Sequence, residues 1–192
     1  MSRRRYASLG TSSLAVFVLL CGIAYAAKGY TDRAGDVAGG SGPDLVSIGL
    51  SNTKASITFR VRFTSAPPLR VSARQNWVDM LLIGIDVPPV GPRPVTPGGE
   101  WPGANFALGT HGPAKTGLLV RLGNRVPEDS RRVATFRIVT TGATVTFSIP
   151  RRLLGRPRWF TFTVATARET EETSGGGVDF APARGTFRYE LT

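Results

Sequence analysis

Three aspartates lie close together near the start of the chain, in the stretch Tyr30–Leu45, which also holds four glycines and almost no apolar side chains. They are Asp32, Asp36 and Asp44. This composition is typical of a loop. Carboxylates spaced along a glycine-rich loop suit a hard cation such as Ca²⁺, which takes about six to eight oxygen ligands. The stretch therefore predicts a structural calcium ion. The spacing does not match an EF-hand, and the alternative is that the aspartates cap turns independently.

A fourth carboxylate, Asp179, precedes the final strand expected from the sequence, in the motif VDFAP. The first and last strands of a β-sandwich commonly lie close together, so we expect Asp179 to meet Asp32, Asp36 and Asp44 at one end of the domain. Carboxylates gathered without a cation repel one another, which raises their pKa values. A Ca²⁺ ion would relieve that repulsion and tie the N-terminal loop to the C-terminal strand.

A second candidate site follows the most apolar strand of the chain, Val78–Val87, which we expect to be buried on both faces near the middle of a sheet. The strand ends at Asp86 and opens onto the loop Val87–Gly103, which holds six prolines and four glycines. Glu100 and Trp101 lie side by side in this loop. A long loop in a compact domain is usually functional or disordered. Asp86, Glu100 and Trp101 are therefore candidate ligand-binding residues, with the tryptophan as a platform for a sugar. The alternative is that Trp101 folds back onto the core, since tryptophan is highly buried on average.

Catalytic patterns are missing from the chain. His111 is the single histidine, and no serine or cysteine nucleophile has an identifiable base beside it in a known motif. There is no phosphate-binding loop, no dinucleotide fingerprint and no His/Cys metal spacing. Asp79, Asp86, Glu100 and Asp179 could form a paired-carboxylate site, but nothing in the sequence marks them out. We therefore expect a binding protein and not an enzyme.

The N-terminus has the pattern of a signal peptide. Arg3–Arg5 form a positive segment, Leu14–Leu20 an apolar one, and Ala24–Ala26 a small-residue cleavage motif. We expect residues 1–27 to be removed, leaving one exported domain of residues 28–192 at the cell surface or outside the cell, with no transmembrane span. A retained anchor is the alternative. The only cysteine, Cys21, lies in the removed part, so the exported domain has no disulfide.

The chain is strongly basic. Its 24 lysines and arginines against 13 acids give a net charge of +11, and removal of Arg3–Arg5 leaves +8. No cluster interleaves aromatic and basic residues, so we do not expect nucleic acid as a partner. The charge is explained first by a generally basic, solvated surface. Two partners remain as candidates, and we favour the first. One is a polysaccharide bound by stacking. The other is an anionic cell-wall polymer, which a structural or adhesion domain would hold through a basic face that includes Arg60 and Arg62.

Period-two alternation of apolar residues recurs along the rest of the chain. In Ser56–Phe63 the apolar positions are Ile57, Phe59, Val61 and Phe63, and similar segments follow at short intervals. Pro150–Gly155 is the exception, because a proline at its start and a glycine at its end predict a single helical turn. Eight to nine strands with almost no helix predict an all-β, antiparallel, jelly-roll-like β-sandwich.

Six segments, in order along the chain, resemble the secreted actinobacterial β-sandwich modules of the DOMON-like and family 9 carbohydrate-binding type. They are Asp32–Ser51, Ile57–Phe63, Leu81–Asp86, Gly103–Gly109, Phe147–Gly155 and Val178–Leu191. The resemblance implies a jelly-roll-like sandwich that binds a ligand without catalysis, in some members with structural calcium. The chain departs from this pattern after Asp86, where Val87-Pro88-Pro89 replaces a second aspartate and a Thr-Gly turn.

Overall fold

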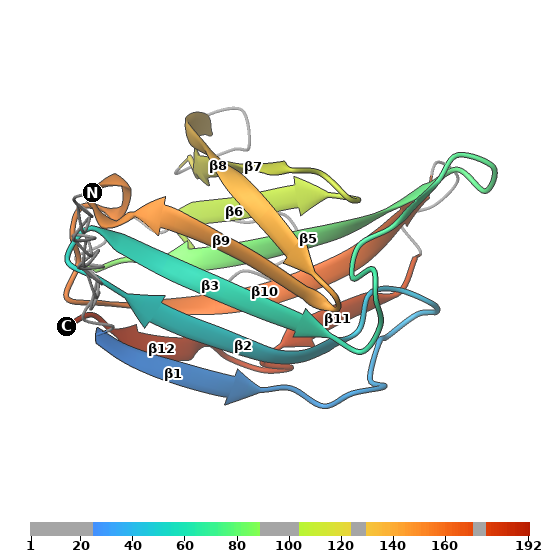
Figure 1. The fold of residues 1–192 in the computed structure, drawn as a ribbon, viewed down its shortest axis with the longest axis horizontal. Coiled ribbons are helices and arrows are strands. Elements are labelled where there is room, and N and C mark those ends of the chain that lie inside the picture. The colour runs from blue at the N-terminus through green and yellow to red at the C-terminus, as the bar shows by residue number, and fades with distance from the viewer. Residues whose placement is uncertain (1–24, 89–103, 124–129, 171–175) are drawn as a thin grey trace, which may run out of the picture.

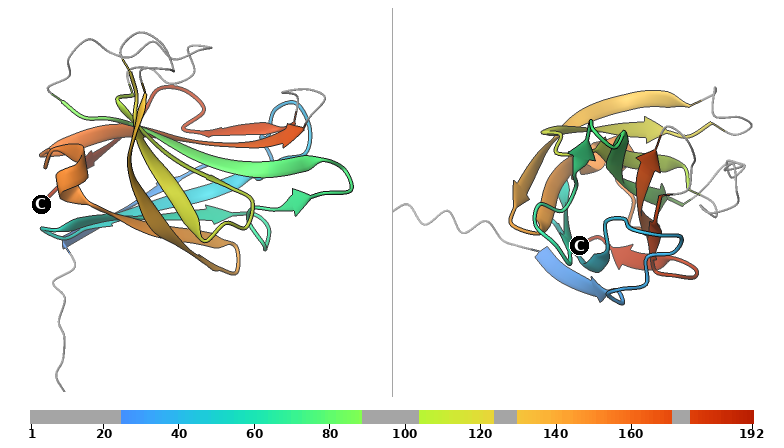
Figure 2. Two further views of the ribbon diagram at one scale, coloured as in Figure 1. Left: turned by 90° about the horizontal axis from the view of Figure 1, so that it is seen from above. Right: turned by 90° about the vertical axis from the view of Figure 1, so that its right-hand side faces the viewer.

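The computed structural model describes residues 25–88, 104–123, 130–170 and 176–192. Most of these residues lie in antiparallel strands, which form the barrel-like sandwich seen in Figures 1 and 2. The strands are β1 (Tyr25–Thr31), β2 (Leu45–Asn52), β3 (Ser56–Phe63), β4 (Val71–Ser72), β5 (Trp77–Asp86), β6 (Phe106–His111), β7 (Thr116–Arg121), β8 (Arg131–Thr141), β9 (Thr144–Pro150), β10 (Trp159–Thr170), β11 (Val178–Ala181) and β12 (Phe187–Glu190). The predicted all-β, antiparallel sandwich is confirmed.

The strands pair in the order β1-β2-β3-β9-β8-β7-β6-β5-β10-β11, with β12 beside β10 and β4 beside β5. Strand β8 belongs to both halves of this path. Its first part pairs with β7, from Arg131 opposite Arg121 onward, and its last part pairs with β9, ending at Thr141 opposite Thr144. One continuous hydrogen-bonded sheet therefore curls around the core.

The core contains many aromatic side chains among its leucines, isoleucines and valines. In β3 the side chains of Phe59 and Phe63 are almost completely buried, while Arg60 and Arg62 between them point to solvent. Phe59 stacks on Phe147 of β9 and meets Phe162 of β10 edge-on, with ring centroids 5.3 and 6.1 Å apart. Burial of a side chain of this size contributes about 1.5–3 kcal/mol to folding. The alternating pattern therefore fixes which face of each strand turns inward.

Strand β5 lies between β6 and β10, as the apolar run from Val78 to Val87 predicted, but it is buried on one face only. Leu81, Ile83 and Ile85 lie in the core, whereas Met80 and Leu82 are half-buried. The expectation of two buried faces was wrong because a single sheet curled around one core has its other side toward solvent.

The predicted helical turn is confirmed as a single 3₁₀ turn, η2 (Arg151–Leu154). It begins after Pro150 and ends at Gly155, whose φ of 78° is left-handed. Within the described ranges no helix is long and apolar enough to cross a membrane. Most of the expected signal peptide, together with Glu100 and Trp101, lies outside the described residues.

The expected cleavage boundary falls inside an element of the fold. Strand β1 begins at Tyr25, and residues Lys28 to Thr31 pair with Leu50 to Ser47 of β2. Cleavage after Ala27 would therefore leave those four paired residues of β1 in the exported domain.

Candidate functional site

Three of the four predicted metal ligands meet at one end of the sandwich. Each of Asp32, Asp36 and Asp179 offers a carboxylate oxygen, and these oxygens all lie within 4.8 Å of one another. Asp32 and Asp36 come from the loop between β1 and β2, whereas Asp179 comes from β11, more than 130 residues further along the chain. Two ligands of one Ca²⁺ ion, each about 2.4 Å from it, lie at most about 5 Å apart. The three oxygens are therefore close enough together to share one cation.

Backbone contacts hold the loop against β11. Ala38 and Val178 form an isolated antiparallel bridge, with two N–H···O bonds of 2.8 Å. Glycine is required at this approach, because a Cβ atom on Gly42 would collide with the carbonyl oxygen of Gly177. The glycines at both positions were a sequence signal for the contact, although nothing in the sequence linked one to the other.

Asp179 and Asp44 have other partners that set their positions. The Asp179 side chain is 2% exposed, and its Oδ2 accepts a 2.7 Å hydrogen bond from the backbone N–H of Leu45. Both carboxylate oxygens of Asp44 accept from the N–H of Gly35, at 3.1 and 2.9 Å. Asp44 thus closes a turn within the loop, as the alternative interpretation expected of an aspartate, and it is not among the three converging carboxylates.

The three carboxylates repel one another. The pKa of Asp32 is raised from 3.8 to about 6, by burial first and then by the nearby charge of Asp179. The pKa of Asp179 is also raised to about 6, by burial and by the charges of Asp36 and Asp44, against a hydrogen bond from Leu45 that lowers it. In addition, Oδ2 of Asp32 is buried and has no hydrogen-bond partner among the residues that the structure describes. A buried oxygen without a partner is costly unless a proton or a cation satisfies it.

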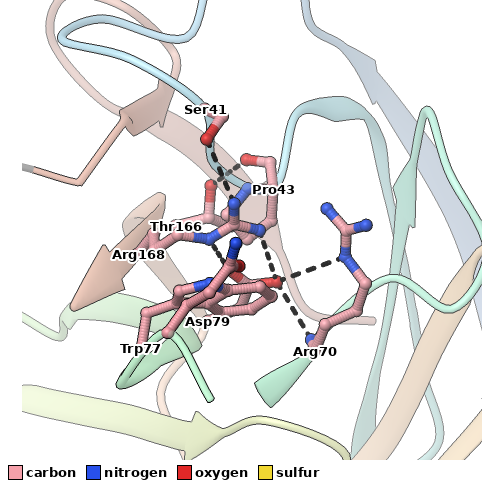
Figure 3. Close-up of polar contacts among 8 residues, drawn as sticks. Ser41, Pro43, Arg70, Trp77, Asp79, Thr166 and Arg168 are labelled. Atoms are coloured by element: carbon pink, nitrogen blue, oxygen red, sulfur yellow. Dashed lines mark hydrogen bonds and ion pairs between the residues drawn. The ribbon is translucent and has the colours of Figure 1, made fainter. Parts of the chain in front are cut away.

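A buried ion pair lies near the same end and was not predicted. Nε of Arg168 (β10) donates to Oδ1 of Asp79 (β5) at 2.8 Å, and its Nη2 donates to Oδ2 at 3.3 Å (Figure 3). The guanidinium also stacks on the ring of Trp77, 3.7 Å from its centroid, and Nη1 donates to Ser41 at 3.1 Å. Asp79 is fully buried, and the backbone N–H of Arg70 donates to it as well. Asp79 is therefore a structural residue, since Arg168 neutralises its charge. The sequence signal was a charged residue in each of the two strands, although nothing in the sequence showed that these residues face each other.

Asp86, the predicted ligand residue at the end of β5, is half-buried beside Asn105. The side chain of Asn105 fastens the start of the loop, accepting from the N–H of Val87 at 3.0 Å and donating to its carbonyl at 3.2 Å. The cavity lined by Asp86 and Thr161 measures only about 10 Å³, which is room for about one water molecule. This cavity is therefore too small for a sugar ring.

The outer face of β2, β3, β9 and β8 is cationic. Arg60 and Arg62 of β3 and Arg137 of β8 are exposed on it, and the positions between them carry hydroxyl side chains such as Thr144 and Thr146. The sequences of β1, β2, β3, β8, β9 and η2 contain no aspartate or glutamate. We call the surface formed by Arg60, Arg62 and Arg137 the arginine face. It is the basic face that the sequence predicted around Arg60 and Arg62.

Comparison of the chain with protein-family models, with curated proteins and with solved structures found no match. The resemblance to DOMON-like and family 9 carbohydrate-binding modules therefore stays a prediction.

Proposed function

We propose that this protein is a secreted, non-catalytic binding domain that holds an anionic polymer of the cell envelope on its arginine face. One observation carries the proposal, namely the segregation of charge over the molecule. The strands that form the face hold no acid, whereas the described acids lie on β5, β10, β11, β12 and the loop after β1. An extended surface of one sign attracts a polymer of the opposite sign along its whole length.

The arginines of the face are available to such a ligand. Within the described part of the chain, Arg60 makes one side-chain hydrogen bond, a 3.4 Å contact with Ser51 Oγ, and neither Arg62 nor Arg137 forms an ion pair. The guanidinium group presents several donors in a planar fork that matches carboxylate and phosphate geometry. The hydroxyl side chains between the arginines are uncharged donors and acceptors for the rest of the polymer.

Binding to polygalacturonate, which carries one carboxylate per sugar, tests this function. We expect affinity to fall steeply between low and high salt, because salt screens the charges. The double variant Arg60→Gln/Arg62→Gln should bind more weakly and with a shallower salt dependence. Arg74→Gln, which removes an exposed arginine from the turn between β4 and β5, is the matched control and should bind as the parent does.

Dextran, a neutral polysaccharide, separates this function from the carbohydrate-binding alternative. Stacking of sugar rings on an aromatic platform should survive high salt and should not need Arg60 or Arg62. Binding of dextran that is insensitive to salt would contradict the anionic-polymer proposal. Equal affinity of the double variant for polygalacturonate would contradict it as well.

We further propose that Asp32, Asp36 and Asp179 hold a structural Ca²⁺ ion. The Oδ2 atom of Asp32 is buried and has no hydrogen-bond partner among the described residues, and the pKa values of Asp32 and Asp179 are raised; both observations support this proposal. Carboxylate oxygens are ligands that Ca²⁺ prefers, and waters or backbone carbonyls complete its shell. Ca²⁺ should raise the midpoint of thermal unfolding of the EDTA-treated protein. Identical melting curves in EDTA and in millimolar Ca²⁺ would contradict it.

A further inference from the structure

A hollow of about 550 Å³ lies between the β2–β3 turn and η2. The β2–β3 turn lies at the end of the sandwich opposite the loop between β1 and β2 (Figure 1). The floor of the hollow is apolar and includes Ala55, Ile149 and Pro150. Three cationic residues line it as well: Lys54 from the turn, Arg152 from η2 and Arg156 just beyond it. Its volume is that of a small-molecule site.

The three cations have no protein partners in the described part of the chain. None of the side chains of Lys54, Arg152 and Arg156 forms an ion pair or a hydrogen bond there. The neighbouring Arg151 is different, because its Nη2 donates to the carbonyl oxygen of Pro157 at 2.9 Å and its Nη1 to that of Thr192 at 3.3 Å. Arg151 therefore has a structural role, whereas the three lining cations are left for a ligand.

The backbone fixes where these cations stand. The N–H of Arg151 donates to the carbonyl of Ala55 at 2.8 Å, which joins the β2–β3 turn to η2. The backbone N–H of Arg156 donates a 3.2 Å hydrogen bond to the carbonyl oxygen of Arg151, and Arg156 has a left-handed φ of 53°. A left-handed conformation is unfavourable for arginine and is unusual before a proline such as Pro157. Such strained positions cluster at ligand sites.

We propose that this hollow binds a phosphate ester, with its phosphate on Lys54, Arg152 and Arg156 and its organic part on the apolar floor. A phosphate monoester carries about −1.5 to −2 charges at neutral pH and three strong acceptor oxygens. Arginine binds such a group through two parallel N–H···O bonds, and lysine binds it as a point charge. A carboxylate, with one negative charge, matches the three cations that line the hollow less well. The site shares no residue with the arginine face, so phosphate binding in the hollow can be tested independently of polymer binding.

Phenyl phosphate is the probe, with benzoate as the matched carboxylate, titrated into the full-length protein at low salt and followed by calorimetry. We expect saturable binding of phenyl phosphate and markedly weaker binding of benzoate. The double variant Arg152→Gln/Arg156→Gln should weaken phenyl phosphate binding by about tenfold or more, because charge-assisted hydrogen bonds are lost. Arg74→Gln, at the opposite end of the molecule, should leave the affinity unchanged within about twofold of the parent.

Two further variants keep the test decisive. Lys54→Gln lies on an exposed turn and should weaken binding even if the double variant fails to fold. Arg60→Gln/Arg62→Gln should bind phenyl phosphate as the parent does, which separates this site from the arginine face. The absence of saturable binding, equal affinity for benzoate, or unchanged affinity in both Lys54→Gln and the folded double variant would overturn the proposal.

Vesicles distinguish the source of the phosphate. Co-sedimentation with vesicles containing phosphatidic acid, but not with phosphatidylcholine alone, identifies a lipid headgroup if Arg152→Gln/Arg156→Gln abolishes it. Binding of phenyl phosphate without that vesicle binding identifies a soluble phosphate ester. Either result supports the site.

Discussion

Replacement of Asp32 by asparagine should have opposite effects on stability with and without Ca²⁺. Without the ion, the substitution removes one of three mutually repelling charges, and the new amide can donate a hydrogen bond to a neighbouring carboxylate. With the ion, it removes a charged ligand. We therefore expect the order of stability of the parent and Asp32→Asn to reverse between EDTA and Ca²⁺.

The size of the effect in EDTA follows from the pKa of Asp32, which is raised from 3.8 to about 6. One pKa unit corresponds to about 1.4 kcal/mol. If the variant removed the whole cost of ionising Asp32, its free energy of unfolding would therefore rise by about 3 kcal/mol. Asp32 is only partly buried, so solvent screening reduces the expected increase in the free energy of unfolding to about 1.5 kcal/mol. For a domain of this size, an increase of that magnitude raises the unfolding midpoint by about 3–6 °C. Ca²⁺ at about 100 times its dissociation constant would add about 2.7 kcal/mol to the free energy of unfolding of the parent protein.

The pH dependence has a defined sign. The pKa values of Asp32 and Asp179 are about 6 in the folded protein, above the unfolded value of 3.8. The folded state therefore holds more protons between these values, and in EDTA the free energy of unfolding should fall as pH rises from about 4 through about 6. Saturating Ca²⁺ should flatten this fall, because the cation replaces the protons.

Thermal unfolding followed by circular dichroism at pH 7.5 and at pH 4 measures both effects. Glu169→Gln, which removes an exposed acid outside the cluster, is the control and should shift the midpoint equally in EDTA and in Ca²⁺. An Asp32→Asn variant that is less stable than the parent in EDTA, or that gains as much from Ca²⁺ as the parent does, would refute the reasoning.

Two other outcomes are expected. Asp79→Asn should lower the free energy of unfolding by about 3–5 kcal/mol, because it leaves Arg168 buried without its counter-charge; a loss below about 1 kcal/mol in a urea titration would argue against a structural role for the pair. N-terminal sequencing of the exported protein should find a first residue near Ala27 or Lys28, as expected for a cleaved signal peptide, whereas an intact N-terminus would indicate a retained anchor.

The fold could be predicted because period-two burial is a local signal. Phe59, Phe147 and Phe162 all face the core as their alternation indicated. The curvature of the sheet is not local, so the half-exposed side of β5 at Met80 and Leu82 was missed. Strand β1 was missed for another reason, since its first residues carry the small-residue pattern of a cleavage site.

The candidate sites also depend on non-local structure that the sequence pattern does not reveal. We expected Asp32, Asp36 and Asp179 to converge because the first and last strands of a sandwich commonly lie close together. The hydrogen bond from the backbone N–H of Gly35 to Asp44 could not be predicted, because it depends on loop geometry that composition does not encode. The pairing of Asp79 with Arg168 requires the register of β5 against β10, in which the two residues face each other. No single-strand pattern contains that register.

Strand β8 has a mechanical consequence. Because it pairs with β7 over its first part and with β9 over its last, it carries the hydrogen-bonded ladder from one half of the molecule to the other. The halves therefore cannot separate by sliding along an apolar interface, as two stacked sheets could; they can part only if the ladder on one side of β8 is broken. Tension that pulls the two halves apart would therefore act on the hydrogen bonds between β8 and one of its two neighbours.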